Sequence, residues 1–260
     1  MPGATASTDA IDAPAEVTEV HTRILRLALG IEESRAYWAN LDPAVPPGPR
    51  AIQAFENRWF GTKSLHRVRT LLGYFGARYD AYPEALEVLR GWKHMDPATR
   101  QVICHWHLQL SDPIYRRLTG EFLVKRRNSA EPQFGRDVVI RWMAATYPSR
   151  WAHSTLIQFA SKLMSASSEA GLITPRKDPR KPLFLKVPDH ALEYLLYLLR
   201  GVQFSGTYAD NPYLASVGLD GGFLDQRLGK LPSIDYRRLV DVSDFGWKYP
   251  SLKAWAEATL

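Results

Sequence analysis

The chain has a single cysteine, Cys104, among its 260 residues. An intrachain disulfide needs two cysteines and a thiolate zinc site needs several, so the sequence excludes both. Sparse cysteine is typical of proteins from a reducing compartment, and we expect a cytoplasmic protein.

Long apolar runs are also missing. The most apolar helical stretch, Ala191 to Leu199, is too short to cross a bilayer and is interrupted by Glu193. The opening residues MPGATASTDAIDAPA lack the basic-then-apolar order of a secretory signal. They are small and polar, which predicts a disordered tail over residues 1–16 and a soluble protein without a membrane partner.

Catalytic signatures are absent as well. The sequence contains no HExxH, no Walker loop, no GxSxG and no GxGxxG, and its acidic residues are scattered. The stretch Cys104-His105-Trp106-His107 suggests a metal site, but on a helix His105 and His107 point in different directions. We expect one packed and one surface histidine, and a protein that is not an enzyme and uses no cofactor, metal or small-molecule substrate.

The positive charge is unevenly distributed. Residues 51–188 carry 22 basic and 11 acidic side chains, a net charge of +11, whereas residues 1–50 and 189–260 are net −3 and −2. Clustered charge focuses the electrostatic field, so this pattern predicts a polyanionic partner for the middle of the chain. The alternative is that these charges point in all directions.

The sequence from 17 to 92 predicts helices only. We expect them over residues 17–40, 51–60, from residue 62, and from Pro83 to Gly91. The proline-rich segment DPAVPPGPR, residues 42–50, is expected to be a linker that is neither helix nor central strand.

Helix starts are clearer after residue 93. Asp96 is a cap with Pro97 at the first helical position, and this helix should run to about Leu110. Asp112-Pro113 starts another helix, which ends near the basic run of residues 125–127.

Two further helices predict a helix-turn-helix pair. The first covers Asp137 to Thr146, Pro148 prevents its continuation, and Ser149 is expected to cap the next helix. In that second helix, one apolar stripe recurs at three- and four-residue steps and predicts a buried face, made of Leu156, Phe159, Ala160, Leu163, Ser167 and Ala170. Gly171 is expected to end it.

A basic connection follows this helix. Leu172-Ile173 and residues 183–187 resemble two short strands, and the segment between them carries four cations against Asp178. Three prolines exclude a helix there. A helix pair followed by a basic hairpin is the order of a winged-helix nucleic-acid-binding protein. The alternative is a core helix followed by a solvated charged loop.

Residues 189–260 repeat this order more weakly. We expect a helix capped by Asp189 and reaching Arg200, short helices from Asn211-Pro212 and over 223–228, and a final helix from Ser251. Strands over 234–242 and 247–249 should form a hairpin that turns at residues 243–246. Because this region is net acidic, DNA contact is weighted lower there than a role in protein–protein contact.

The predicted fold is therefore mainly α. A helical N-terminal domain (17–92) precedes a helical plus winged-helix-like domain (93–188) and a second winged-helix-like domain (189–260). The two winged-helix-like domains each have a short β-hairpin wing. The candidate DNA-binding residues are the polar and basic positions of these helices and of the first wing: Lys63, Arg67, Arg126, Arg127, Ser154, Thr155, Gln158, Lys162, Arg176, Lys177, Arg180, Lys181 and Lys186.

Three segments carry a family resemblance. They are Arg50 to Asp80, Trp151 to Ile173, and the closing helices and hairpin before KYPSLKAWAEA. In this order they resemble the BrxA family of bacteriophage exclusion (BREX) systems. The HWHLQLSDPIYR stretch is not a feature of that family's pattern, which leaves a divergent member or a related protein open.

The resemblance implies a mostly helical protein with helix-turn-helix elements that binds double-stranded DNA without known catalysis. Its partners would be duplex DNA and other defence proteins encoded nearby. Two alternatives remain: an assembly scaffold that docks other subunits, and an RNA-binding protein, since basic helical surfaces distinguish duplex types poorly.

Overall fold

The computed structural model describes residues 13–239 and 242–260 and is mainly helical. In chain order its elements are η1 (Arg23–Leu25), α1 (Ile31–Asn40), α2 (Pro47–Glu56), α3 (Leu65–Tyr79), α4 (Pro83–Gly91), α5 (Pro97–Ser111), α6 (Pro113–Arg117), the π-helix η2 (Leu118–Phe122), α7 (Leu123–Arg127), α8 (Arg136–Thr146), α9 (His153–Glu169), α10 (Asp189–Arg200), α11 (Pro212–Ser216), α12 (Gly221–Leu228), β1 (Ile234–Leu239), β2 (Val242–Trp247) and α13 (Leu252–Thr259). None of the helices in these ranges is long and apolar enough to cross a membrane.

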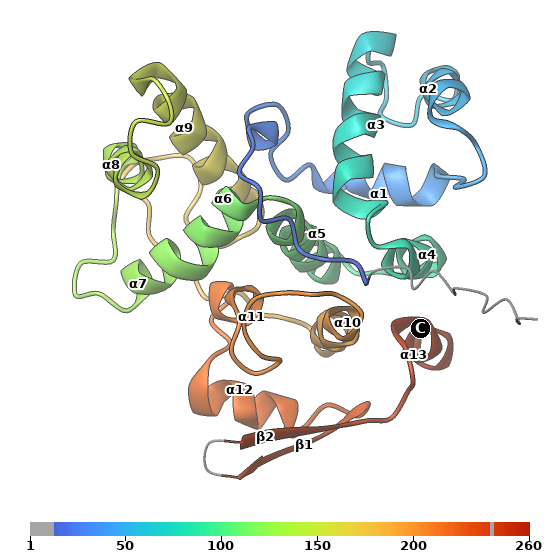
Figure 1. The fold of residues 1–260 in the computed structure, drawn as a ribbon, viewed down its shortest axis with the longest axis vertical. Helices are drawn as coiled ribbons and strands as arrows, with labels where there is room; N and C mark the ends of the chain where they lie inside the picture. The colour runs from blue at the N-terminus through green and yellow to red at the C-terminus, as the bar shows by residue number, and fades with distance from the viewer. Residues whose placement is uncertain (1–12, 240–241) are drawn as a thin grey trace, which may run out of the picture.

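Helix α5 lies at the centre of the fold (Figure 1). It packs against α1, α3, α6 and α10, and every residue from 102 to 111 is buried. The prediction of one packed and one surface histidine is therefore wrong, because His105 and His107 are both inaccessible to solvent. A helix that is enclosed on all sides buries polar residues together with apolar ones.

The first region contains two corrections. The predicted helix over 17–40 is broken, because Gly30 adopts φ 63° and α1 begins only after it. The proline-rich linker over 42–50 contains the start of α2, with Pro47 in its first turn. Proline is tolerated there because the first amide groups of a helix have no intrahelical acceptor.

The cap at Asp96 was predicted correctly, and so were the helix starts at Asp112-Pro113, Asn211-Pro212 and Ser251. Asp96 accepts hydrogen bonds from the amides of Ala98 and Thr99, and Asp112 accepts one from Tyr115. Asn211 and Ser251 cap α11 and α13 in the same way. Asp189 is instead the first residue of α10, with Pro188 at the cap position and no side-chain cap.

The only sheet within the described residues is the antiparallel pair β1–β2. Its register pairs Ile234 with Trp247 and Leu239 with Val242. The hairpin was predicted, but its turn was not: the predicted turn residues 243–246 lie inside β2. Residues 240–241, between the two strands, lie outside the described residues.

The segment from Pro14 to Val17 ties distant parts of the chain together, and we call it the N-terminal strap. Its backbone pairs with Gln203, and the Val17 amide donates to the Leu110 carbonyl. The predicted disordered tail over 1–16 is therefore wrong for residues 13–16, whereas residues 1–12 lie outside the described residues. Ordering of the strap requires side-chain partners that are 67 to 197 residues away in the chain, which no local pattern reveals.

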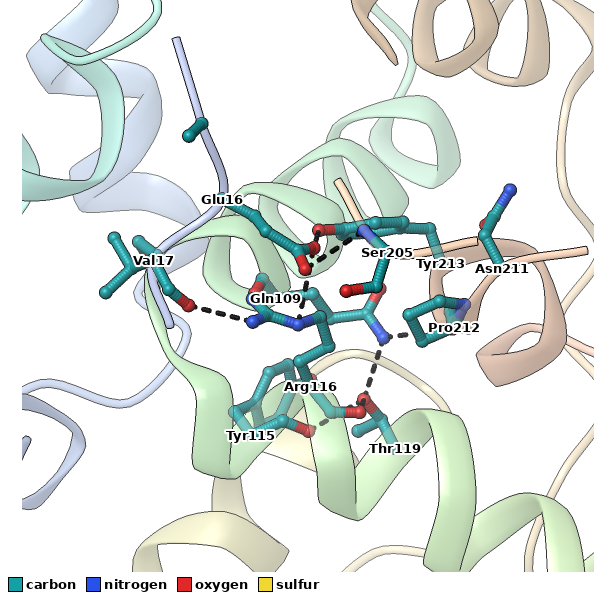
Figure 2. A network of polar contacts seen from close by, with 12 residues as sticks. Glu16, Val17, Gln109, Tyr115, Arg116, Thr119, Ser205, Asn211, Pro212 and Tyr213 are labelled. Carbon is teal, nitrogen blue, oxygen red and sulfur yellow. Dashed lines mark hydrogen bonds and ion pairs between the residues drawn. The ribbon is translucent and has the colours of Figure 1, made fainter. Parts of the chain in front are cut away.

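Glu16 is the centre of the strap (Figure 2). Its carboxylate accepts hydrogen bonds from the Ser205 amide and the Tyr213 hydroxyl, and lies 3.5 Å from the Arg116 guanidinium. Arg116 also donates to the carbonyls of Gln109 and Val17. These contacts join α5 and α6 to the residues that precede and form α11.

A single core unites the three sequence regions. Its buried members include Phe75 from the first region, Trp106 from the second and Tyr194 from the third. At the C-terminus, α13 packs against α4 and α10, and Lys253 bonds Glu84 and Glu87. The regions 17–92, 93–188 and 189–260 are thus packed on one another.

Gly120 in η2 allows α11 to approach closely. A Cβ added at Gly120 would lie 2.5 Å from the Cβ of Pro212, so Gly120→Ala forces these elements apart. We expect Gly120→Ala to lower the free energy of unfolding by about 1–3 kcal/mol, the usual cost of overpacking. Gly73→Ala is the matched control: nothing lies within 4 Å of that added Cβ, and it should stabilise α3 by about 0.5–1 kcal/mol. Urea unfolding measures both, and equal effects would contradict the close approach.

Candidate nucleic-acid interface

Helices α8 and α9 pack against each other (Figure 1). Gly135 precedes α8, and the chain turns through residues 147–152 before α9. The prediction that Ser149 caps α9 is wrong. Ser149 adopts φ 57°, and Ala152 occupies the cap position. The turn is thus longer than the sequence suggested, although the helix pair itself was predicted.

Helix α9 has the two faces that its pattern predicts. The stripe from Leu156 to Ala170 is buried, with Phe159, Ala160 and Leu163 inaccessible to solvent. Gly171 follows at φ 76°, the left-handed conformation expected of it. The outward face carries Ser154, Gln158, Lys162 and Ser165, all exposed. Thr155 is half-buried, so it is less available for contact than predicted.

The basic connection after α9, residues 174–181, closes as a narrow loop, and we call it the basic loop. Ile173 bridges Pro182, and Phe134, just before α8, bridges Arg180. These are isolated bridges, so the two strands predicted at 172–173 and 183–187 do not form as strands. The bridges nevertheless bring the start of α8, the end of α9 and the basic loop together.

Arg180 stabilises the basic loop from within. Its guanidinium donates to the carboxylate of Asp178 and to the carbonyls of Thr174 and Arg176. Because these bonds occupy the side chain, Arg180 shapes the loop and does not extend from it. The other cations of the basic loop, Arg176, Lys177 and Lys181, are exposed, and so is Lys186 beyond it.

Two predicted contact residues at the end of α7 lie elsewhere. Arg127 points into the protein: it donates to the carbonyls of Ala215 and Ser216 and lies over the ring of Phe184. Burial lowers the pKa of this guanidinium. Arg127 therefore anchors α11 and is not a surface cation. Arg126 lies over the Phe122 ring and is half-exposed.

Lys63 and Arg67 lie beside a different set of charges. Lys63 pairs with Glu33 at 3.8 Å, and the nearby Gly30 amide donates to Glu169 at the end of α9. Carboxylates thus separate Lys63 from the outward face of α9. Arg67 is half-buried on α3, which packs with α1, α2, α4 and α5.

Arg136 was missed by the sequence reasoning. Its side chain is exposed in the first turn of α8 and lies 3.5 Å from the Ser161 hydroxyl on α9. Its backbone amide donates to Asp178 in the basic loop. Arg136 thus lies where α8, α9 and the basic loop meet. A basic residue that opens the first helix of a helix-turn-helix pair was the available signal.

The chemistry of this surface is that of anion recognition. Exposed ammonium and guanidinium groups extend from α9 and the basic loop, and short polar groups lie between them on α9. Cations of this kind bind phosphate oxygens, and Ser and Gln side chains can hydrogen-bond base edges. The acidic side chain within the basic loop, Asp178, is engaged by Arg180 and the Arg136 amide.

The two buried histidines, His105 and His107, lie in the core and do not belong to this surface. His105 bonds Tyr115 and Ser216, whereas His107 bonds Tyr194. Burial lowers the pKa of each imidazole to about 3, so both stay neutral at physiological pH. In the part of the chain that is described, no three His, Cys, Asp or Glu side chains gather in a way that could hold a metal ion.

The hairpin of the third region has a mixed surface. Arg238 pairs with Asp225 on α12, and Asp235, Arg237 and Asp244 are exposed. Cations and carboxylates alternate there, unlike in the basic loop.

Compared with known proteins, the chain matches no family model, no curated protein and no solved structure.

Proposed function

We propose that this chain is a non-enzymatic protein that binds duplex DNA through α9 and the basic loop. The observation that carries the proposal is the junction at Arg136, which joins the outward face of α9 to the basic loop through Ser161 and Asp178. A polar helix face continuous with exposed cations offers phosphate contacts and groove contacts on one surface.

The order of elements supports a winged-helix interpretation of residues 113–187. The helical segment 113–127 is followed by the Phe134 bridge, then α8 and α9, then the Ile173 bridge, the basic loop and Pro182. Two isolated bridges, Phe134 with Arg180 and Ile173 with Pro182, thus lie beside the helix pair where a winged-helix protein has its small sheet. In this geometry α9 is the recognition helix.

The biological setting is proposed from the family resemblance. A BrxA-like role would make the chain a DNA-binding accessory protein of a cytoplasmic BREX phage-defence system, working beside other defence proteins. A second candidate, an assembly scaffold, is favoured by the mixed surface of the third region and by Phe223, which is 55% exposed on α12.

The test is a titration of the protein into labelled duplex DNA, single-stranded DNA and duplex RNA at two salt concentrations. We expect tightest binding to duplex DNA, with an affinity that falls steeply with salt because phosphate contacts release counterions. Tighter binding to duplex RNA would make the chain an RNA-binding protein. The absence of binding to any of them at low salt would favour the scaffold.

Replacing Lys162, Arg176, Lys177 and Lys181 with alanine localises the site. We expect a loss of affinity of about tenfold or more at low salt, and a salt slope that becomes shallower by about one for each phosphate contact removed. The control variant replaces Arg69, Lys230, Arg237 and Lys248 with alanine, which removes the same charge from exposed positions outside this surface. Equal losses in both variants would mean that net charge, and not this surface, determines binding.

A further inference from the structure

A second cluster of cations surrounds a cleft formed by residues 35–39 and 89–100. The cleft lies between α1, α4 and the start of α5, has a volume of about 310 Å³, and we call it the basic cleft. Its walls include four basic side chains, Arg35, Arg90, Lys93 and Arg100, and no acidic one among the described residues. It shares no lining residue with α8, α9 or the basic loop.

The charges around the basic cleft are only partly compensated. Glu32 accepts a hydrogen bond from Arg35 at 2.9 Å and one from Arg100 at 3.1 Å. The bond from Arg35 is the first cause of the lowered pKa of Glu32, which therefore stays ionised. Arg90 and Lys93 are exposed, and the described residues provide no ion pair or hydrogen bond for their side chains. Glu32 thus compensates two of the four cations, Arg35 and Arg100.

Two tryptophans complete the walls. Trp38 is 3% exposed, and its indole N–H has no acceptor within the described chain. A buried donor without an acceptor is unfavourable, so it calls for a partner that the described residues do not supply. Trp92 also lines the cleft, is half-buried and packs edge-on against Trp255. Cations and tryptophan side chains thus line one cavity.

We propose that the basic cleft binds the phosphate group of a small ligand of the nucleoside diphosphate class. Guanidinium and ammonium groups are the side chains that bind phosphate, and arginine does so with paired hydrogen bonds. The volume lies at the lower end of the range for small-molecule sites, about 300–1,000 Å³. The lining tryptophans, Trp38 and Trp92, suit an aromatic base. This inference is independent of the proposed DNA binding.

Calorimetric titration of the whole protein with ADP, adenosine and inorganic phosphate tests the proposal. ADP should bind saturably with one site per chain, adenosine should bind far more weakly, and inorganic phosphate should compete with ADP. The double variant Arg90→Ala with Lys93→Ala should weaken ADP about tenfold or more, because two uncompensated charges are lost. The matched control, Arg69→Ala with Lys230→Ala, should bind ADP within about twofold of the unaltered protein.

Three results would overturn it. One is the absence of saturable ADP binding at millimolar concentration. Another is an equal loss in the cleft variant and its control, which would mean that net charge alone attracts the nucleotide. The third is displacement of ADP by duplex DNA together with weaker DNA binding in the cleft variant, which would make the basic cleft part of a nucleic-acid surface. Because DNA affinity is measured separately, failure here leaves the proposed function intact.

Discussion

Replacing Glu16 with alanine should lower the free energy of unfolding by about 3–5 kcal/mol, the usual cost of breaking a buried ion pair from one side. Glu16 is 7% exposed, and its carboxylate receives hydrogen bonds from Ser205 and Tyr213. Without it, Arg116 keeps a buried positive charge with only carbonyl partners. Two donors also lose their acceptor. Urea unfolding at pH 7.5 measures the loss.

The control is Glu19→Ala, which removes the same charge from an exposed position three residues along the chain. We expect that variant to stay within about 0.5 kcal/mol of the unaltered protein, as is usual for surface substitutions. Glu16→Gln keeps the shape and one acceptor, so its loss should lie between the two. A change of less than 1 kcal/mol in Glu16→Ala would show that the N-terminal strap does not anchor the fold.

Hydrogen exchange distinguishes local release of the strap from general destabilisation. The amides of Glu16, Val17 and Gln203 donate across the strap to carbonyls of other segments. In Glu16→Ala these amides should exchange faster than those of α9, whose hydrogen bonds do not depend on the strap. A uniform change in exchange would instead mean that the fold unfolds as one unit.

Local patterns predicted most of the helices because their causes are local. The periodicity of α9, the prolines at the starts of α4, α5 and α6, and caps such as Asp96 and Asn211 all act within one or two turns. The break at Gly30 was missed because the apolar spacing continues across it. The hairpin turn was misplaced because residues 243–246 contain both turn-forming and strand-forming types.

Long-range burial could not be predicted in the same way. Nothing in HWHLQ distinguishes a half-exposed helix from one that is enclosed by α1, α3, α6 and α10. The polar side chains of α5 are satisfied by residues from other elements: His105 by Ser216, and Gln109 by Thr119 and Pro212. Such pairs span up to 111 positions in the chain. Burial of the N-terminal strap has the same origin.

The candidate site shows the same limit. Sequence reasoning identified the exposed cations of the basic loop, since charged residues beside prolines belong to surface loops. It could not separate surface cations from structural ones by residue type: Arg176 is exposed, whereas Arg127 and Arg180 bond backbone carbonyls. Arginine serves both purposes because its fork of donors suits carbonyl oxygens as well as phosphates.

Acidification should destabilise the protein through its two interior histidines. Each has a folded-state pKa of about 3 against an ordinary value of 6.5. Between these values the unfolded chain binds a proton that the folded protein rejects, so stability is present above pH 6.5 and is lost as the pH falls towards 3. From pH 7.5 to 5 each histidine should remove about 2 kcal/mol, and the pair about 4 kcal/mol.

His107→Gln isolates one of these contributions. Glutamine cannot take up a proton in this range, so the variant, whatever its stability at pH 7.5, should lose about 2 kcal/mol less than the unaltered protein between pH 7.5 and 5. His66→Gln, at an exposed position of α3, should leave that pH dependence nearly unchanged. Burial also raises the pKa of Asp112, which acts in the opposite direction, but it is common to all three proteins and cancels in the comparison. Parallel curves for His107→Gln and the unaltered protein would mean that water or a rearrangement reaches His107 and lets it ionise in the folded state, contrary to its enclosure against Tyr194.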